Sequence, residues 1–158
     1  MKICLLIHSK TGNTLYVAQK LVEKLQLHGH EIDLVRIEAY NDNETKPDAV
    51  RLLQVPQIQS YDVIIVGGPV RGFSFSPVLQ AFFLKTPSLQ GKKMFGFVTQ
   101  FFPSSGMGGN QALEQFSNIC RNKGGTLIKK GSIQWIIPFT RQALIHELVE
   151  NFTAELSK

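Results

Sequence analysis

The chain has 158 residues, of which 43% are hydrophobic and 18% are charged, and its formal net charge is +5. This length corresponds to about one domain, and the composition excludes a disordered tail or a fibre. No apolar run approaches the roughly 20 residues that a bilayer span needs, and no signal-peptide cleavage site follows the run from Ile3 to Ile7. We therefore expect one domain over residues 1–158, located in the cytoplasm.

Short apolar runs alternate with amphipathic stretches along the chain. The run at residues 2–7 predicts a first strand, and apolar positions on one face predict a helix at 14–27. Alternating apolar and polar residues predict a half-buried strand at 31–37. A polar loop follows at 40–46, after which Pro47 begins a short helix.

The most strand-like stretch is at residues 62–66, where Val-Ile-Ile-Val follows Asp62 without a polar interruption, as in a strand covered on both faces. The same patterns predict a helix from Ser76-Pro77 to Phe83, a strand at 94–99, a helix at 110–122, a fifth strand within 126–137 and a helix at 140–156. Five strands separated by helical segments predict a parallel sheet with helices on both faces.

The sharpest motif joins the first strand to the first helix and consists of Ser9, Lys10, Thr11, Gly12, Asn13 and Thr14. Small residues let the backbone curl so that successive N–H groups point into one hollow, and the helix N-terminus adds partial positive charge. Hydroxyl and amide side chains add further donors. The spacing is neither GxxxxGK[ST] nor GxGxxG, and the donors exceed what an ordinary helix cap needs. We therefore predict a phosphate-binding loop.

Two glycine-rich loops follow the third and fourth predicted strands, at residues 67–77 and 99–110. In a doubly wound sheet of order 2-1-3-4-5, the strand order reverses between strands 1 and 3, and ligands bind there at the carboxyl ends of the strands. We therefore expect both loops to face the ligand whose phosphate the first loop binds.

Within these loops, Phe73 and Phe75 are candidates to offer aromatic faces, with local packing as the alternative for each. Thr99 and Gln100 are candidates to donate hydrogen bonds to a ring. No Asp or Glu occurs from Val63 to Leu113, although this stretch carries four Lys or Arg residues. The basic excess is compatible with nucleic acid, a membrane surface or an anionic small molecule as the partner. Its placement in the loops of the expected site favours the small molecule, and we expect no nucleic acid.

A phosphate site beside neutral, aromatic, glycine-rich loops suits a planar conjugated ring attached to a phosphate. On these features the chain resembles the flavodoxin-like family over essentially its whole length, and residues 9–14 match that family's [ST]-x-T-G-N-T pattern. The resemblance implies an α/β fold, a three-layer sandwich around a five-stranded parallel sheet of order 2-1-3-4-5. It also implies FMN as the cofactor, with its phosphate at residues 9–14.

The resemblance further assigns residues around the flavin ring, while the chemistry itself belongs to the flavin and no catalytic side chain is expected. These ring residues are Pro69, Val70, Arg71, Gly72, Phe73, Thr99, Gln100, Phe101, Phe102, Gly106 and Gly109. Flavodoxins usually carry Trp or Tyr against the flavin and acidic residues around it, whereas this chain has phenylalanines and no carboxylate in either ring loop. The stretch at 67–72 looks closer to flavin reductases of the same superfamily.

Three functions follow from this resemblance. The leading expectation is an NAD(P)H-dependent oxidoreductase that passes electrons through FMN to a quinone or similar acceptor. The first alternative is a one-electron carrier between partner proteins, which the basic charge disfavours because the family's carriers are usually acidic. The second is a non-redox module for another phosphorylated ligand. Assembly into a homo-oligomer stays open.

The remaining candidate side chains carry weaker signals. His8 is expected to be hydrogen-bonded at the end of the first strand or to approach the phosphate. The other histidines, His28, His30 and His146, lack metal-ligand spacing, so we expect no metal site. Cys4 and Cys120 are expected to be buried, unpaired residues in a strand and a helix.

Overall fold

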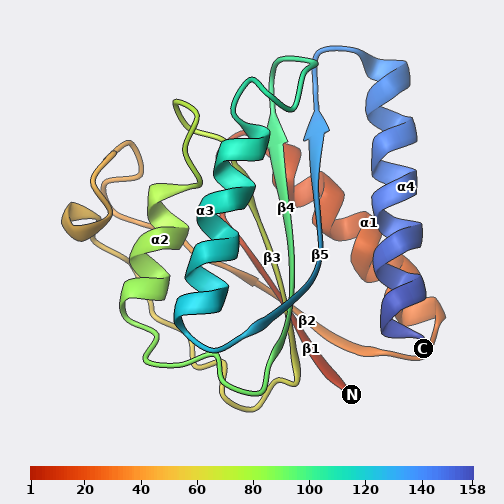
Figure 1. Ribbon diagram of the computed structural model, residues 1–158, viewed down its shortest axis with the longest axis horizontal. Coiled ribbons are helices and arrows are strands. Elements are labelled where there is room, and N and C mark those ends of the chain that lie inside the picture. Colours follow the sequence, from red (N-terminus) through yellow and green to blue (C-terminus); the bar gives the residue numbers. More distant parts are fainter.

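The computed structural model describes residues 1–158 and contains a five-stranded parallel sheet in the order β2-β1-β3-β4-β5, with helices on both faces (Figure 1). The elements are β1 (Lys2–Ile7), α1 (Asn13–Leu27), β2 (Glu31–Arg36), the 3₁₀ turn η1 (Pro47–Ala49), β3 (Val63–Pro69), α2 (Pro77–Leu84), β4 (Lys93–Gln100), α3 (Gly109–Asn122), β5 (Thr126–Gln134) and α4 (Pro138–Leu156). The predicted three-layer α/β sandwich is confirmed.

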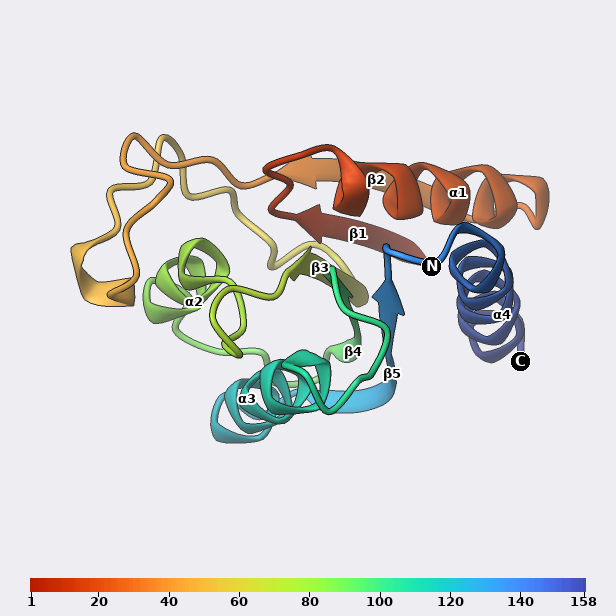
Figure 2. The same cartoon turned by 90° about the horizontal axis from the view of Figure 1, so that it is seen from above.

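The helices form two layers, with α2 and α3 on one face of the sheet and α1 and α4 on the other (Figures 1 and 2). Side chains of β1 alternate between two apolar cores, because successive residues of a strand point to opposite faces. Cys4 and Leu6 pack on the α2–α3 side, whereas Ile3 and Leu5 pack on the α1–α4 side. Both cysteines are free and buried, as expected.

Two glycines in the central strands allow aromatic rings to pack close to the strand backbone. A Cβ at Gly67 would come within 2.2 Å of the Phe97 ring, and a Cβ at Gly96 within 2.4 Å of the Phe116 ring. These distances are far below van der Waals contact, so glycine is required at both positions for this packing. The two rings belong to opposite cores.

The connection between β2 and β3 differs most from its prediction. The short helix predicted to begin at Pro47 is a single 3₁₀ turn, and the chain folds back so that Ala39 pairs with Leu52 in an antiparallel bridge. The Asn41 side chain holds this fold, since its amide donates to the Ala49 carbonyl (2.9 Å) and its oxygen accepts from the Arg51 N–H (2.8 Å). The connection therefore carries residues 41–43 to the carboxyl end of the sheet.

Helices α1, α3 and α4 begin one or two residues earlier than predicted. Helix α4 starts at Pro138 rather than residue 140, because proline is favourable in the first helical turn, where no N–H is needed. No helix of the chain combines the length and the apolar composition that crossing a bilayer demands.

Candidate functional site

A cavity of about 280 Å³ lies where β1, β3 and β4 end, at the upper end of the sheet in Figure 1. Strands β1 and β3 are parallel neighbours, but the connection after β1 leads to β2 on one side and the connection after β3 leads to β4 on the other. This place is therefore the switch point of the topology. The lining residues are Lys10, Thr11, Asn13, Pro69, Val70, Arg71, Thr99, Gln100 and Phe101. The structure thus brings the three predicted loops together around one cavity.

The backbone of residues 9–14 presents free hydrogen-bond donors. None of the N–H groups of these residues donates to another backbone group, and no side chain accepts from them. Gly12 has a left-handed conformation (φ 93°) and precedes the first turn of α1. That turn adds the partial positive charge of a helix N-terminus. The loop therefore has the donors that an anion needs.

The buried hydroxyls of this region have a structural role. Thr14 Oγ1 lies 3.0 Å from Thr99 Oγ1, so these two side chains join the loop at residues 9–14 to β4. Ser9 Oγ accepts a hydrogen bond from the Leu15 N–H at 3.1 Å. The side chains of Thr11 and Asn13 remain without partners in the protein, at the cavity wall. The predicted donors therefore divide into loop-holding and cavity-facing groups.

Gln100 does not match its predicted role as a donor to a ring. Its amide nitrogen donates to the carbonyls of Phe102 (2.7 Å) and Ser104 (2.6 Å), which holds the loop after β4 in place. Its oxygen is buried without a partner, and a Cβ at Gly109 would come within 2.2 Å of it. Gln100 and Gly109 therefore shape this loop.

Phenylalanine side chains separate into exposed and buried groups. Phe73, at φ 64°, is 59% exposed, and Phe101 is 62% exposed with its ring 5.4 Å from that of Phe102. Phe75, in contrast, is buried against Phe116 at a centroid distance of 5.4 Å. The interpretation of Phe75 as an aromatic face at the cavity was therefore wrong, because this side chain belongs to the apolar core.

One carboxylate reaches the edge of the cavity from outside the acid-free stretch. Asp42, in the β2–β3 connection, has Oδ2 4.0 Å from Lys10 Nζ, and its carbonyl accepts a hydrogen bond from Arg71 Nη1 at 3.2 Å. Lys10 also donates to the Asn43 side chain. Sequence reasoning missed Asp42, since only the path of this long connection places it between two loops of the site.

His8 is bonded at both ring nitrogens. Nδ1 lies 2.7 Å from Ser76 Oγ, and Nε2 lies 2.7 Å from Asp42 Oδ1, in surroundings that leave the side chain 2% exposed. Ser76 is the N-cap of α2, and its Oγ accepts from the Leu79 N–H. His8 is therefore fixed at the end of β1, directly before the loop at residues 9–14.

A family model described as NADPH-dependent FMN reductase matches residues 1–139. The chain belongs to this family. The match to the FMN reductase model includes all three loops around the cavity and ends at the start of α4.

Solved structures show the same fold as this FMN reductase family member. A flavodoxin of Streptococcus pneumoniae TIGR4 has 15% identity and a TM-score of 0.69, with 98% of this chain and 99% of that chain covered. The two-electron reduced flavodoxin of Megasphaera elsdenii has 22% identity and a TM-score of 0.68, covering 96% and 98%. A WrbA-like flavodoxin of Agrobacterium tumefaciens has 14% identity and a TM-score of 0.65, covering 98% of each chain. No curated protein matches the sequence.

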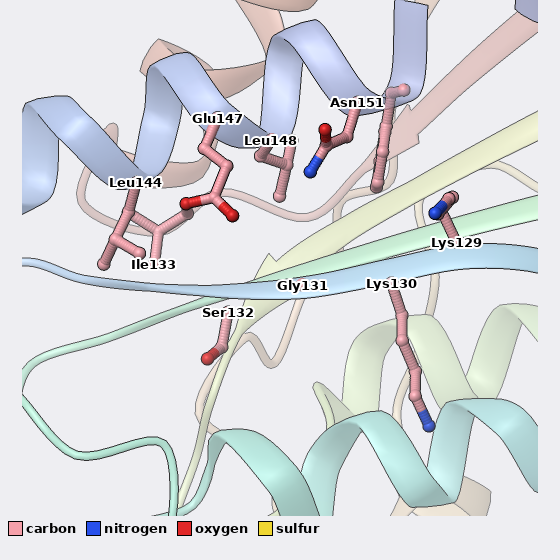
Figure 3. Close-up of a pocket in the computed structure, with 10 residues that line it drawn as sticks. Lys129, Lys130, Gly131, Ser132, Ile133, Leu144, Glu147, Leu148 and Asn151 are labelled. Carbon is pink, nitrogen blue, oxygen red and sulfur yellow. The ribbon is translucent and has the colours of Figure 1, made fainter. Parts of the chain in front are cut away.

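A second cavity, of about 130 Å³, lies between β5 and α4 (Figure 3). It exists because Gly131 has no side chain, and a Cβ there would come 3.0 Å from Leu148 Cδ1. Ile133 points toward α4, whereas Ser132 and Lys130 point away from it toward α3 (Figure 3). No predicted site residue lines this cavity, and its α4 wall lies outside the part that matches the FMN reductase model. We interpret it as a packing gap.

Proposed function

We propose that the chain binds FMN in the cavity where β1, β3 and β4 end, and that it is an oxidoreductase that takes electrons from NAD(P)H. The observation that carries this proposal is the run of free N–H groups at residues 9–14. A phosphate accepts several hydrogen bonds at once, and the positive end of a helix favours its negative charge. Membership of the family supports FMN as the molecule that carries this phosphate.

The rest of the cavity fits an aromatic ring attached to that phosphate. The exposed rings of Phe73 and Phe101 offer faces for stacking. Gly72, at φ 53°, lets the loop after β3 turn tightly beside the cavity. Lys10 and Arg71 supply positive charge at the wall. The residues around the cavity therefore offer contacts for both the anionic and the aromatic part of FMN.

Bound FMN would supply the hydride and electron transfer, while the residues of the chain bind and orient it. No pair of a nucleophile and an adjacent base opens onto the cavity. His8 is buried, and the Asp42 carboxylate is bonded to it. A small planar acceptor, such as a quinone, fits the uncharged aromatic side of the cavity.

Titration of the apoprotein with FMN and with riboflavin tests this assignment. We expect FMN to bind at least about tenfold more tightly, because one hydrogen bond to a charged group contributes about 1.5–3 kcal/mol. Thr11→Ala removes a free hydroxyl at the cavity and should reduce this preference. Thr126→Ala, at an exposed threonine of β5, is the matched control. Equal affinities for FMN and riboflavin would overturn the phosphate assignment.

A one-electron carrier is the second candidate, because large apolar side chains are exposed near the cavity. Besides Phe101, these include Ile136, whose N–H bonds to the Phe101 carbonyl, and the nearly fully exposed Phe139. Such a surface suits the docking of another protein. Turnover of NAD(P)H with a quinone by the purified protein supports the reductase, whereas turnover only with a separate reductase supports the carrier. Purified protein without flavin absorbance, and without affinity for added FMN, would favour a non-redox module.

A further inference from the structure

A chain of hydrogen bonds links the phosphate loop region to the N-terminus of α2. It runs from the Leu79 N–H to Ser76 Oγ, on to His8 Nδ1, and from His8 Nε2 to Asp42 Oδ1. Both bonds of the imidazole have 2.7 Å between heavy atoms, and Ser76 is completely buried. The proposed function assigns no role to these hydrogen bonds.

The partners of His8 determine where its proton lies. An ionised carboxylate only accepts hydrogen bonds, so Nε2 carries the hydrogen that faces Asp42. Nδ1 then accepts from the Ser76 hydroxyl, whose oxygen in turn accepts from the Leu79 N–H. Every donor and acceptor is therefore satisfied with a neutral imidazole, and the Asp42–His8 pair has a net charge of −1.

Asp42 balances the cations beside the phosphate loop. Its Oδ2 lies 4.0 Å from Lys10 Nζ, and its carbonyl accepts from Arg71 Nη1. An anion bound by residues 9–14 would lie beside the same two cations, Lys10 and Arg71, and its negative charge would add to that of Asp42. Like charges this close disfavour each other, and a proton on His8 relieves the repulsion because it neutralises the pair.

We propose that the Asp42–His8 pair is a proton-linked counter-charge of the phosphate site, so that binding of a phosphate group is accompanied by proton uptake at His8. This inference rests on the proposed function in one respect, the placement of a phosphate at residues 9–14. The proton comes from solvent, which the pair reaches through the half-exposed Asp42 side chain. His8 acts through Asp42 and the loop, as a positioning residue.

The charged groups around His8 set the direction of this linkage. The pKa of His8 is lowered from its ordinary value mainly by burial; Asp42 raises this pKa, and the charges of Arg71 and Lys10 lower it. From the side of β2, Arg36 donates to the Ser9 carbonyl rather than to the pair. A bound phosphate counteracts Arg71 and Lys10, so it raises the His8 pKa. By linkage, phosphate then binds more tightly as the pH falls through the pKa of His8.

Histidine ring NMR of the holoprotein and of the apoprotein tests this proposal. The His8 signals are assigned by their loss in His8→Gln, and the pH titration is repeated with no ligand, with riboflavin, with inorganic phosphate and with FMN. We expect an Nε2–H tautomer in the free protein and a higher His8 pKa with phosphate or FMN than with riboflavin. The ring signals of the exposed His28 and His146 serve as internal references.

Two variants connect the titration to affinity. His8→Gln keeps an N–H donor toward Asp42 but does not titrate, so its FMN affinity should lack the gain at low pH that the wild type shows. Each unit by which FMN raises the His8 pKa corresponds to a gain of at most about tenfold. Asp42→Asn keeps the hydrogen-bond acceptor without its charge, so it should lower the His8 pKa in the free protein. The phosphate's own titration is common to all three proteins and cancels in the comparison.

The outcomes separate this inference from the proposed function. If FMN and riboflavin bind equally, the assignment of the FMN phosphate to residues 9–14 fails. The pH titration of His8 with inorganic phosphate alone then decides whether His8 responds to a bound phosphate. If FMN binds more tightly than riboflavin but the His8 pKa is the same with both, the counter-charge proposal is overturned while the proposed function stands. If His8→Gln does not fold, substitution of the other three histidines assigns the His8 signals by elimination, and the wild-type titration still gives a decisive result.

Discussion

At the scale of single residues, the side chains nearest the cavity mostly hold the loops, and most of the donors for a ligand belong to the backbone. Thr14 bonds to Thr99, and Gln100 bonds to the loop that follows it. Backbone donors cannot be removed by substitution of a side chain. Changes at the buried hydroxyls are therefore expected to appear first in the stability of the fold.

Replacing Thr14 by Val tests this expectation. The Thr99 hydroxyl would stay buried without its partner, so the free energy of unfolding should fall by about 1–3 kcal/mol. Chemical denaturation monitored by far-UV circular dichroism measures the change. The double variant Thr14→Val/Thr99→Val should recover part of the loss, because neither hydroxyl is then left unpaired. Wild-type stability in Thr14→Val would contradict the loop-holding role.

Arg71 provides a prediction about the electron donor. Its guanidinium lies in the cavity wall and is held by the Asp42 carbonyl, where it can meet an anionic substrate. Arg71→Glu should raise the KM for NADPH more than it raises the Kd for FMN. The matched control is Lys85→Glu, which makes the same charge change at an exposed site where α2 ends, away from the cavity. Equal effects of the two variants on KM would show that Arg71 acts only through net charge.

At the scale of elements, hydrophobic periodicity predicted the five strands and their helices, because a strand buried on both faces and an amphipathic helix have distinct patterns. The loops of the site followed from the topology, since ligands bind where the strand order reverses. Asp42 could not be placed, because the fold of its connection depends on tertiary contacts such as those of Asn41. Phe73 and Phe75 share one loop, and only the packing against Phe116 separates the exposed ring from the buried one.

The contact between β3 and β4 gives a prediction at this scale. Gly67→Ala would place a methyl group within 2.2 Å of the Phe97 ring, so the ring or the strand must move. Overpacking of this kind costs about 1–3 kcal/mol, and we expect a loss of unfolding free energy in that range. Gly106→Ala is the control, because the nearest atom to its added Cβ is 3.5 Å away. A crystal structure of Gly67→Ala in which neither the Phe97 ring nor strand β3 has moved would refute the packing argument.

At the scale of the whole molecule, the distribution of charge distinguishes the two candidate redox roles. Between residues 63 and 146 the only acidic residue is Glu114, so the loops around the aromatic side of the cavity carry no negative charge. Asp42 lies at the edge of the cavity beside Lys10 and Arg71, whose positive charges offset its negative charge. The protein therefore lacks the acidic surroundings that disfavour an anionic, fully reduced flavin.

We expect the two one-electron reduction steps of the FMN-bound protein to lie close together. Nearby carboxylates repel reduced FMN, and each such charge near a protein surface contributes about 1–4 kcal/mol. At about 59 mV per tenfold change in equilibrium, the absence of a few repulsions raises the second potential by on the order of 100 mV relative to an acidic carrier. A spectroelectrochemical titration measures both steps. Widely separated steps, without NAD(P)H oxidation in the presence of a quinone, would favour the carrier.

The division of the helices between the two faces has a consequence for how the protein is made. Helices α2 and α3 precede β5, but α4 is the last element of the chain and shares its core with α1. On the ribosome, the α2–α3 side of β1, β3 and β4 can therefore be covered while the other side still lacks Phe152 and Leu156. At about 5–20 residues per second, synthesis of residues 123–158 leaves this apolar surface open for several seconds. A nascent chain stalled before α4 should therefore bind chaperones through the α1 side of its sheet.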